Sequence, residues 1–150
     1  MFSFQLLNHP ESFSIDETHI AQIFALVAES VDIPQNGTLN IALLSDDEIQ
    51  VLNREHRGID STTDVLSFHY YDDFSDTWSD EIAGEIILSE SRIVSQATEH
   101  GNTLQKECEI LVLHSILHIL WYDHETDEEY VEMWELERAL RTSMDLNFSN

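Results

Sequence analysis

The sequence is short of several residue types, and each shortage excludes a class of protein. A single cysteine, Cys108, cannot form a disulfide within the chain. No run of eighteen or more uncharged apolar residues is present, and residues 1–11 lack the basic stretch and apolar core of a secretion signal. With only 4 Gly and 2 Pro, the chain has no evident flexible linker. We therefore expect a cytoplasmic protein without membrane segments, folded as a single domain over residues 1–150.

Basic residues are scarce as well. The chain has 6 Lys and Arg against 30 Asp and Glu, which gives a formal net charge of −24 at pH 7. Such a charge favours solubility and repels polyanions, most strongly at low salt. Two explanations remain open at this stage. Either the partner is not a nucleic acid, or the acidic residues cover faces away from the functional site and the protein works in salty or magnesium-rich surroundings.

Three histidines in the last third of the chain predict a metal site. His114 and His118 are four positions apart, so on a helix both imidazoles lie on one face and can reach one ion. His124 can join them only if the helix ends near residues 120–122 and the chain turns back. Three imidazoles with an open fourth position are typical of catalytic zinc, and we expect one zinc ion per chain.

The residue after the first histidine helps to decide which chemistry is expected. Zinc peptidases of the HExxH type carry a glutamate there as general base, and this chain has Ser115. A peptidase is therefore disfavoured. Cys108 falls within the apolar helix that carries the histidines, so we expect it to be a small buried side chain.

Apolar periodicity and capping residues divide the chain into short elements. Strands are expected at residues 2–7, 39–44, 65–70 and 85–88, and helices after capping boxes at 14–17, 45–48 and 126–129, over 91–99, and after Thr103. The acidic segment 72–81 is expected to be a mobile surface loop. An apolar stripe of the last helix is assigned to the core: Tyr130, Met133, Trp134, Leu136 and Leu140. This order predicts the α+β class, with a mixed sheet of about four strands covered by helices and a central helix that carries the HxxxH motif.

Four segments resemble one known family in the right order. The run HSILHILWYDH at residues 114–124 resembles the H-G-x-L-H-L-x-G-Y-D-H signature of the YbeY family. LNREHR at 52–57 is similar to the family's L-N-x-x-Y-R segment, TDVLSF at 63–68 to its T-D-V-L-S-F strand, and GEI at 84–86 to its G-D-I strand. Ser115 and Trp121 stand where the family has glycine, and His69 stands where it usually has proline.

The resemblance implies a metal-dependent endoribonuclease that acts in ribosomal RNA maturation and ribosome quality control. It implies that His114, His118 and His124 bind zinc and that Arg57 faces the cleft, where a guanidinium can grip phosphate oxygens. Asp123 is a candidate for orienting a histidine or the attacking water, although a turn role for this carboxylate is an open alternative. The implied partners are single-stranded RNA and the ribosome or its assembly factors.

Two other functions remain open on the sequence. The chain could be a non-catalytic metal-binding or assembly protein in which the histidines form a structural metal site, and a fourth protein ligand is then expected. It could also be a metal-dependent hydrolase of a substrate other than RNA, which the strongly acidic composition keeps in play.

Overall fold

The computed structural model describes residues 1–120 and 126–148, with side chains described at 1–120 and 126–145. The elements in chain order are β1 (Ser3–Leu6), α1 (Glu17–Ser30), β2 (Thr38–Leu44), α2 (Asp46–Arg57), β3 (Val65–His69), the 3-10 turn η1 (Phe74–Asp76), β4 (Ile82–Ser89), α3 (Glu90–His100), α4 (Leu104–Leu120) and α5 (Asp127–Phe148). The expected strands and helices are all found, with bounds that differ by a few residues.

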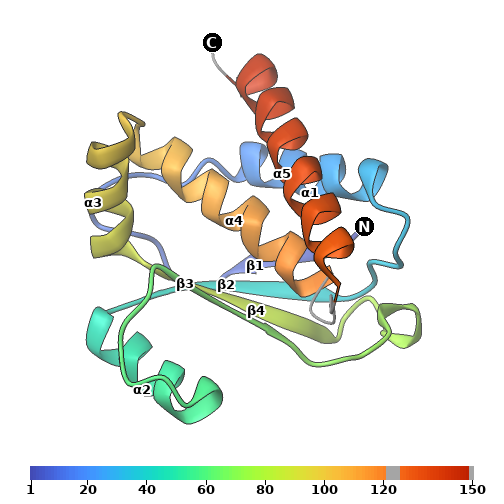
Figure 1. Cartoon of the computed structure of the whole chain (residues 1–150), viewed down its shortest axis with the longest axis horizontal. Helices are drawn as coiled ribbons and strands as arrows, with labels where there is room; N and C mark the ends of the chain where they lie inside the picture. The colour runs from blue at the N-terminus through green and yellow to red at the C-terminus, as the bar shows by residue number, and fades with distance from the viewer. Residues whose placement is uncertain (121–125, 149–150) are drawn as a thin grey trace.

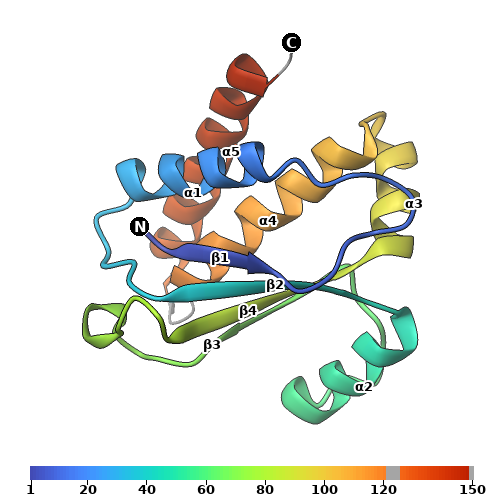
Figure 2. The same cartoon turned by 180° about the vertical axis from the view of Figure 1, so that it is seen from behind.

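The four strands form one mixed sheet in the order β1-β2-β4-β3. β1, β2 and β4 are parallel, and β3 runs antiparallel to β4 at the edge. Helices α1, α4 and α5 lie on one face of the sheet and α2 lies on the other (Figures 1 and 2). The predicted α+β class and four-stranded mixed sheet are therefore confirmed.

Two apolar clusters hold these layers together. The larger one joins α1, α4 and α5 to the sheet, and alternate β2 residues, Leu39, Ile41 and Leu43, point into it. The smaller one lies under α2 and is centred on Ile49, Leu66 and Ile87. Helix α4 contacts α1, α3, α5, β3 and β4, so it is the central helix of the fold.

Local capping residues set several helix ends. The predicted capping box at α2 is confirmed, because the Ser45 side chain accepts from the Glu48 backbone and the Glu48 side chain accepts from Ser45. The box predicted for α1 at residues 14–17 is wrong: Asp16 is the N-cap, and its Oδ1 accepts from Thr18 N at 2.9 Å. A carboxylate is as good a cap as a serine hydroxyl, and two such residues only two positions apart cannot be told apart by spacing.

The acidic segment between β3 and β4 is anchored to the core. Phe74 is buried and meets Phe2 edge to face, with ring centroids 5.2 Å apart. The Tyr71 hydroxyl donates to Glu81 across the segment. The expectation of a mobile loop overlooked this one buried aromatic.

None of the helices in the described ranges is both long and apolar enough to cross a membrane.

Candidate functional site

The two histidines of the HxxxH motif stand together on α4. Their ring centroids are 4.1 Å apart with an angle of 52° between the ring planes, as expected for positions i and i+4 of one helix. Ser115, Ile116, Leu117 and Ile119 around them are buried, whereas the His114 side chain is 37 % exposed. The imidazole pair is therefore the accessible strip of an otherwise buried helix end.

The third predicted ligand follows the end of α4 in the sequence. His124 and Asp123 lie outside the described residues, as does the turn expected after residue 120. Within residues 1–120 and 126–145, no three His, Cys, Asp or Glu side chains come together in a group that could hold a metal ion. The three-histidine site and the role of Asp123 thus remain predictions.

A carboxylate from α5 holds the first histidine. The Oε1 atom of Glu137 lies 2.5 Å from His114 Nδ1, and Glu137 is only 6 % exposed. Glu137 reaches this position because α5 packs on α4 through Met133 and Leu140, which flank it on the buried face of the helix. The ring of His114 is therefore fixed from one side.

The charge state of Glu137 decides which ring nitrogen is available. Burial by itself raises the pKa of this carboxyl, but the hydrogen bond with His114 and the positive charges of His114, Arg141 and His118 outweigh it and hold the pKa below its usual range. An ionised carboxylate can only accept, so His114 Nδ1 donates, and Nε2 is the ring nitrogen that can bind a metal ion once it carries no proton. Carboxylates commonly orient metal-binding histidines in this way.

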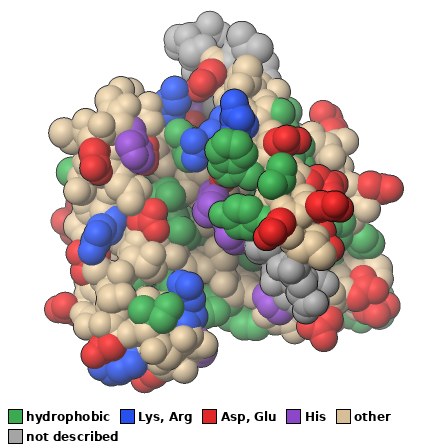
Figure 3. Space-filling view, in the orientation of Figure 1, with side chains coloured by type: hydrophobic (Ala, Val, Ile, Leu, Met, Phe, Trp, Pro, Cys, Tyr) green, Lys and Arg blue, Asp and Glu red, His purple; other side chains and the backbone are tan. Residues whose placement is uncertain are grey.

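Arg57 lies in the last turn of α2 and is exposed. Among the described side chains it has no carboxylate partner within 4 Å, whereas Arg54 on the same helix lies 3.7 Å from Asp60. Figure 3 shows arginine side chains of α2 and histidine side chains above them on one face, on either side of a hollowed surface. Asp64, just before β3, accepts a hydrogen bond at Oδ2 from Gln96 Nε2 at 3.1 Å and is not among the described carboxylates within 4 Å of an arginine.

Two features of α5 were missed in the sequence. Glu137 is one of 30 acidic residues, so its charge alone did not single it out. Its place between Met133 and Leu140 on the apolar stripe was the signal that could have indicated a buried carboxylate. The assignment of that stripe to the core was partly wrong. Met133 and Leu140 are buried, but Tyr130 is 52 % and Trp134 is 49 % exposed.

Comparisons with known proteins agree with this fold. The profile of the family described as Endoribonuclease YbeY matches residues 5–145. The chain is 35% identical to the protein named Endoribonuclease YbeY of Shouchella clausii over 81% of each chain. It is 34% identical to the protein of that name in Clostridioides difficile, over 91% of this chain and 92% of the relative.

A solved structure is similar too. The solution structure of TM1509 from Thermotoga maritima superposes with a TM-score of 0.62 and 28% identity, covering 99% of this chain and 92% of that one. The profile match covers most of the sequence, and the relatives exceed 30% identity over more than two thirds of it. On this evidence, the chain belongs to the YbeY endoribonuclease family.

Proposed function

We propose that this protein is a zinc-dependent endoribonuclease that hydrolyses phosphodiester bonds of single-stranded RNA during ribosomal RNA maturation and ribosome quality control. Its place of action would be the cytoplasm, on the ribosome or with its assembly factors. Family membership supports the reaction class, since the matched relatives carry the name Endoribonuclease. The observation in this chain that carries the proposal is the buried Glu137 carboxylate bound to His114 beside His118.

The donor set fits a divalent ion of the zinc type. Neutral imidazoles are preferred ligands of zinc, and a ring whose Nδ1 is already committed to a carboxylate presents Nε2 in a defined direction. His114 and His118 would hold the ion together with His124, with one ion per chain. A bound ion would supply Lewis-acid activation of water and of a phosphoryl oxygen.

The other residues of the site would bind and orient the RNA. Arg57, with no described carboxylate partner, is free to grip a phosphate through two parallel hydrogen bonds. Asp123 would orient the third histidine or the attacking water. Glu137 keeps His114 fixed during the reaction and does not touch the substrate.

The exposure of the His114 side chain favours a catalytic metal site over a structural one. Structural zinc sites are closed by four protein ligands, whereas a catalytic ion needs a position open to solvent. The His114 side chain is more than one third exposed, which leaves room for substrate beside it. A non-catalytic role would require a further protein ligand to close this side.

The test combines metal analysis with RNA cleavage. Purified protein should contain about one zinc ion per chain and cut a single-stranded RNA in a chelator-sensitive reaction. His114→Ala should lose both properties, whereas His56→Ala, which removes an exposed histidine of α2, should keep them. Cleavage that persists after complete metal removal would exclude the proposed mechanism.

A further inference from the structure

A stripe of aromatic and basic side chains runs along the exposed side of α5. Tyr130, Trp134, Arg138 and Arg141 follow one another at steps of four, four and three residues. At 100° per residue these positions fall within an arc of about 80° on the helix surface. All four are exposed, and we call them the α5 stripe.

Neither arginine of the stripe makes a close ion pair among the described residues, although the charge of Arg141 helps to lower the pKa of Glu137. Neither Arg138 nor Arg141 lies within 4 Å of an acidic side chain among residues 1–120 and 126–145, although the chain has 30 such residues. By contrast, Lys106 is paired with Asp145 at 3.0 Å. Unpaired guanidiniums in so acidic a protein are available for an anion from outside.

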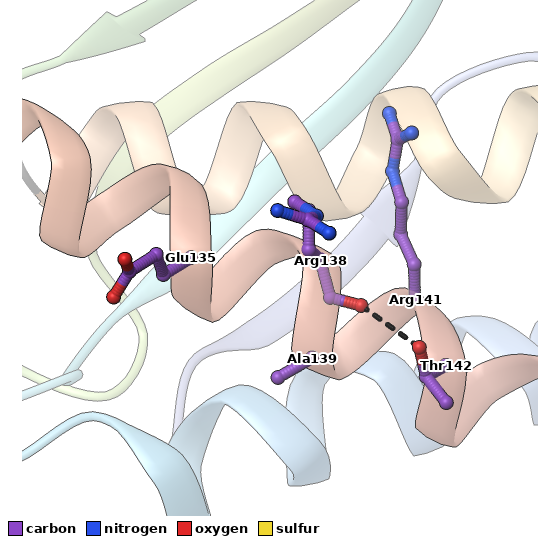
Figure 4. A pocket seen from close by; sticks show the side chains of 5 residues that line it. All are labelled: Glu135, Arg138, Ala139, Arg141 and Thr142. Atoms are coloured by element: carbon purple, nitrogen blue, oxygen red, sulfur yellow. Dashed lines mark hydrogen bonds between the residues drawn. The ribbon is translucent and has the colours of Figure 1, made fainter.

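The side chains are also oriented together. The Arg138 guanidinium lies over the Trp134 ring at 4.8 Å from its centroid. In Figure 4, Arg138 and Arg141 both point from α5 toward α4, while Glu135 points away from them. The open pocket that they line with Glu135, Ala139 and Thr142 has a volume of about 520 Å³. All its lining comes from one helix, so it is a surface for a flexible ligand rather than an enclosed binding site.

The α5 stripe borders the histidine site. Glu137, which binds His114, lies between Trp134 and Arg138 along the helix and faces the neighbouring buried side. Figure 3 shows Lys and Arg side chains and hydrophobic side chains gathered next to the histidines on the same face. A strand bound at the histidines can therefore continue along α5 without crossing the molecule.

We propose that the α5 stripe binds the single-stranded RNA substrate beside the hydrolytic site, with an unpaired base stacked on Trp134 and backbone phosphates bound by Arg138 and Arg141. The inference rests on the proposed function and adds a binding surface outside the predicted metal ligands and Arg57. Bases stack on aromatic side chains only when unpaired, and guanidiniums bind phosphate oxygens through parallel hydrogen bonds. An acidic peptide could pair with the arginines, but it carries no nucleobase to stack on the half-exposed indole.

The experiment measures binding of a fluorescent single-stranded RNA of about 12 nucleotides, a length within the range of known single-strand sites. Its riboses carry 2′-O-methyl groups, and a denaturing gel after each titration shows that the strand is intact, so that binding is read without cleavage. The proteins compared are the full chain, the double variant Arg138→Gln/Arg141→Gln, Trp134→Ala, and Arg92→Gln. Arg92 is an exposed arginine of α3 and controls for the loss of one positive charge elsewhere.

We expect two distinct signatures. Above the salt concentration at which binding is strongest, the double variant should bind more weakly, and its slope of log affinity against log salt should be smaller by about 1.4, because about 0.7 is lost per phosphate contact to single strands. Trp134→Ala should weaken binding about fivefold or more with an unchanged slope, since stacking is not ionic. Arg92→Gln should behave as wild type. Arg138→Lys/Arg141→Lys should restore the slope, which a merely unfolded helix would not do.

Three results would overturn the inference: equal binding by the double variant and wild type, equal losses in Arg92→Gln, or wild-type binding no stronger to the single strand than to a duplex of the same sequence. Failure of the proposed function is seen separately, as absence of metal-dependent cleavage by the wild-type chain. If wild type cleaves RNA and the double variant binds and cleaves it equally well, the α5 stripe alone is excluded.

Discussion

Replacing Glu137 by glutamine should weaken metal binding while leaving the metal-free fold nearly as stable as before. The substitution keeps the shape of the side chain and removes its charge. The hydrogen bond to His114 Nδ1 at 2.5 Å would then be made by a neutral acceptor, which raises the basicity of the ring less and restrains it less. Loss of an orienting partner of this kind typically costs 10- to 100-fold in metal affinity, or about 1.4–2.7 kcal/mol.

Without metal, two opposing changes of similar size are expected. A hydrogen bond to a charged group contributes about 1.5–3 kcal/mol and a neutral one about 0.5–1.5 kcal/mol, so the weaker bond destabilises the fold by roughly 1–1.5 kcal/mol. Glu137 is buried, and removal of its charge relieves a desolvation cost that offsets much of this loss. The net change in the free energy of unfolding should therefore stay below about 1 kcal/mol.

The assay is a zinc titration against a competing chelator, together with thermal unfolding of the metal-free protein. Glu135→Gln is the matched control, because Glu135 is an exposed glutamate on the same helix, whereas the carboxylate bound to His114 is that of Glu137. Wild-type zinc affinity in Glu137→Gln would refute the view that Glu137 orients the metal ligand. A large loss of stability in the metal-free variant would instead make Glu137 chiefly a structural residue.

Three further predictions concern other parts of the chain. Arg57→Gln should lower kcat/KM for RNA cleavage by about 10- to 150-fold with unchanged zinc content, as expected for loss of a charged phosphate contact. Wild-type kinetics in this variant would exclude the proposed contact between Arg57 and a phosphate. Gly84→Ala should lower the free energy of unfolding by about 1–3 kcal/mol in denaturant titrations, because an added Cβ would lie 2.3 Å from the backbone oxygen of Phe68. An unchanged midpoint of the denaturant transition would contradict the close approach of β3 to Gly84. Asp46→Asn should reduce stability at neutral pH, because hydrogen bonds led by that from Ser89 hold the pKa of Asp46 below its ordinary value of 3.8. A group whose pKa is lowered in the folded state stabilises the fold above its unfolded pKa and loses that stabilisation as the pH falls. The difference in the free energy of unfolding between wild type and Asp46→Asn should therefore close as the pH falls below 3.8, and a difference that persists there would refute the reasoning.

Much of the fold could be predicted because its signals are local. The Ser45 capping box, the positive-φ Gly58 after α2 and the alternating burial of β2 each depend on residues within one element. The order of the strands could not be predicted in this way. In the sheet, β2 pairs with β4, and β3 lies at the edge. This order depends on which long connections cross the sheet, and the residue pattern within a single strand does not indicate it.

In the candidate site too, some residues could be predicted from local spacing and others are brought in only by packing between helices. The His114 and His118 pair could be predicted because both residues lie on one helix at a fixed spacing. Glu137 lies 23 residues from His114, and only the packing of α5 on α4 brings the two together. The exposure of Trp134 was missed for a related reason: its spacing fits the buried stripe, but the arc of α5 covered by the core ends at Met133 and Glu137.

The net charge of −24 and an RNA substrate are compatible if binding is governed by charge within a short distance of the site. At physiological ionic strength the Debye length is about 8 Å, so carboxylates on remote faces are largely screened from a strand bound along α4 and α5. The described basic residues without a close carboxylate partner include Arg57 on α2 and Arg138 and Arg141 on α5, which are the arginines proposed to contact the RNA. At low salt the screening fails and the whole acidic surface repels the strand, whereas at high salt the arginine contacts weaken. Affinity for RNA should therefore pass through a maximum at intermediate salt, and a steady fall from the lowest salt upward would mean that remote carboxylates play no part in binding.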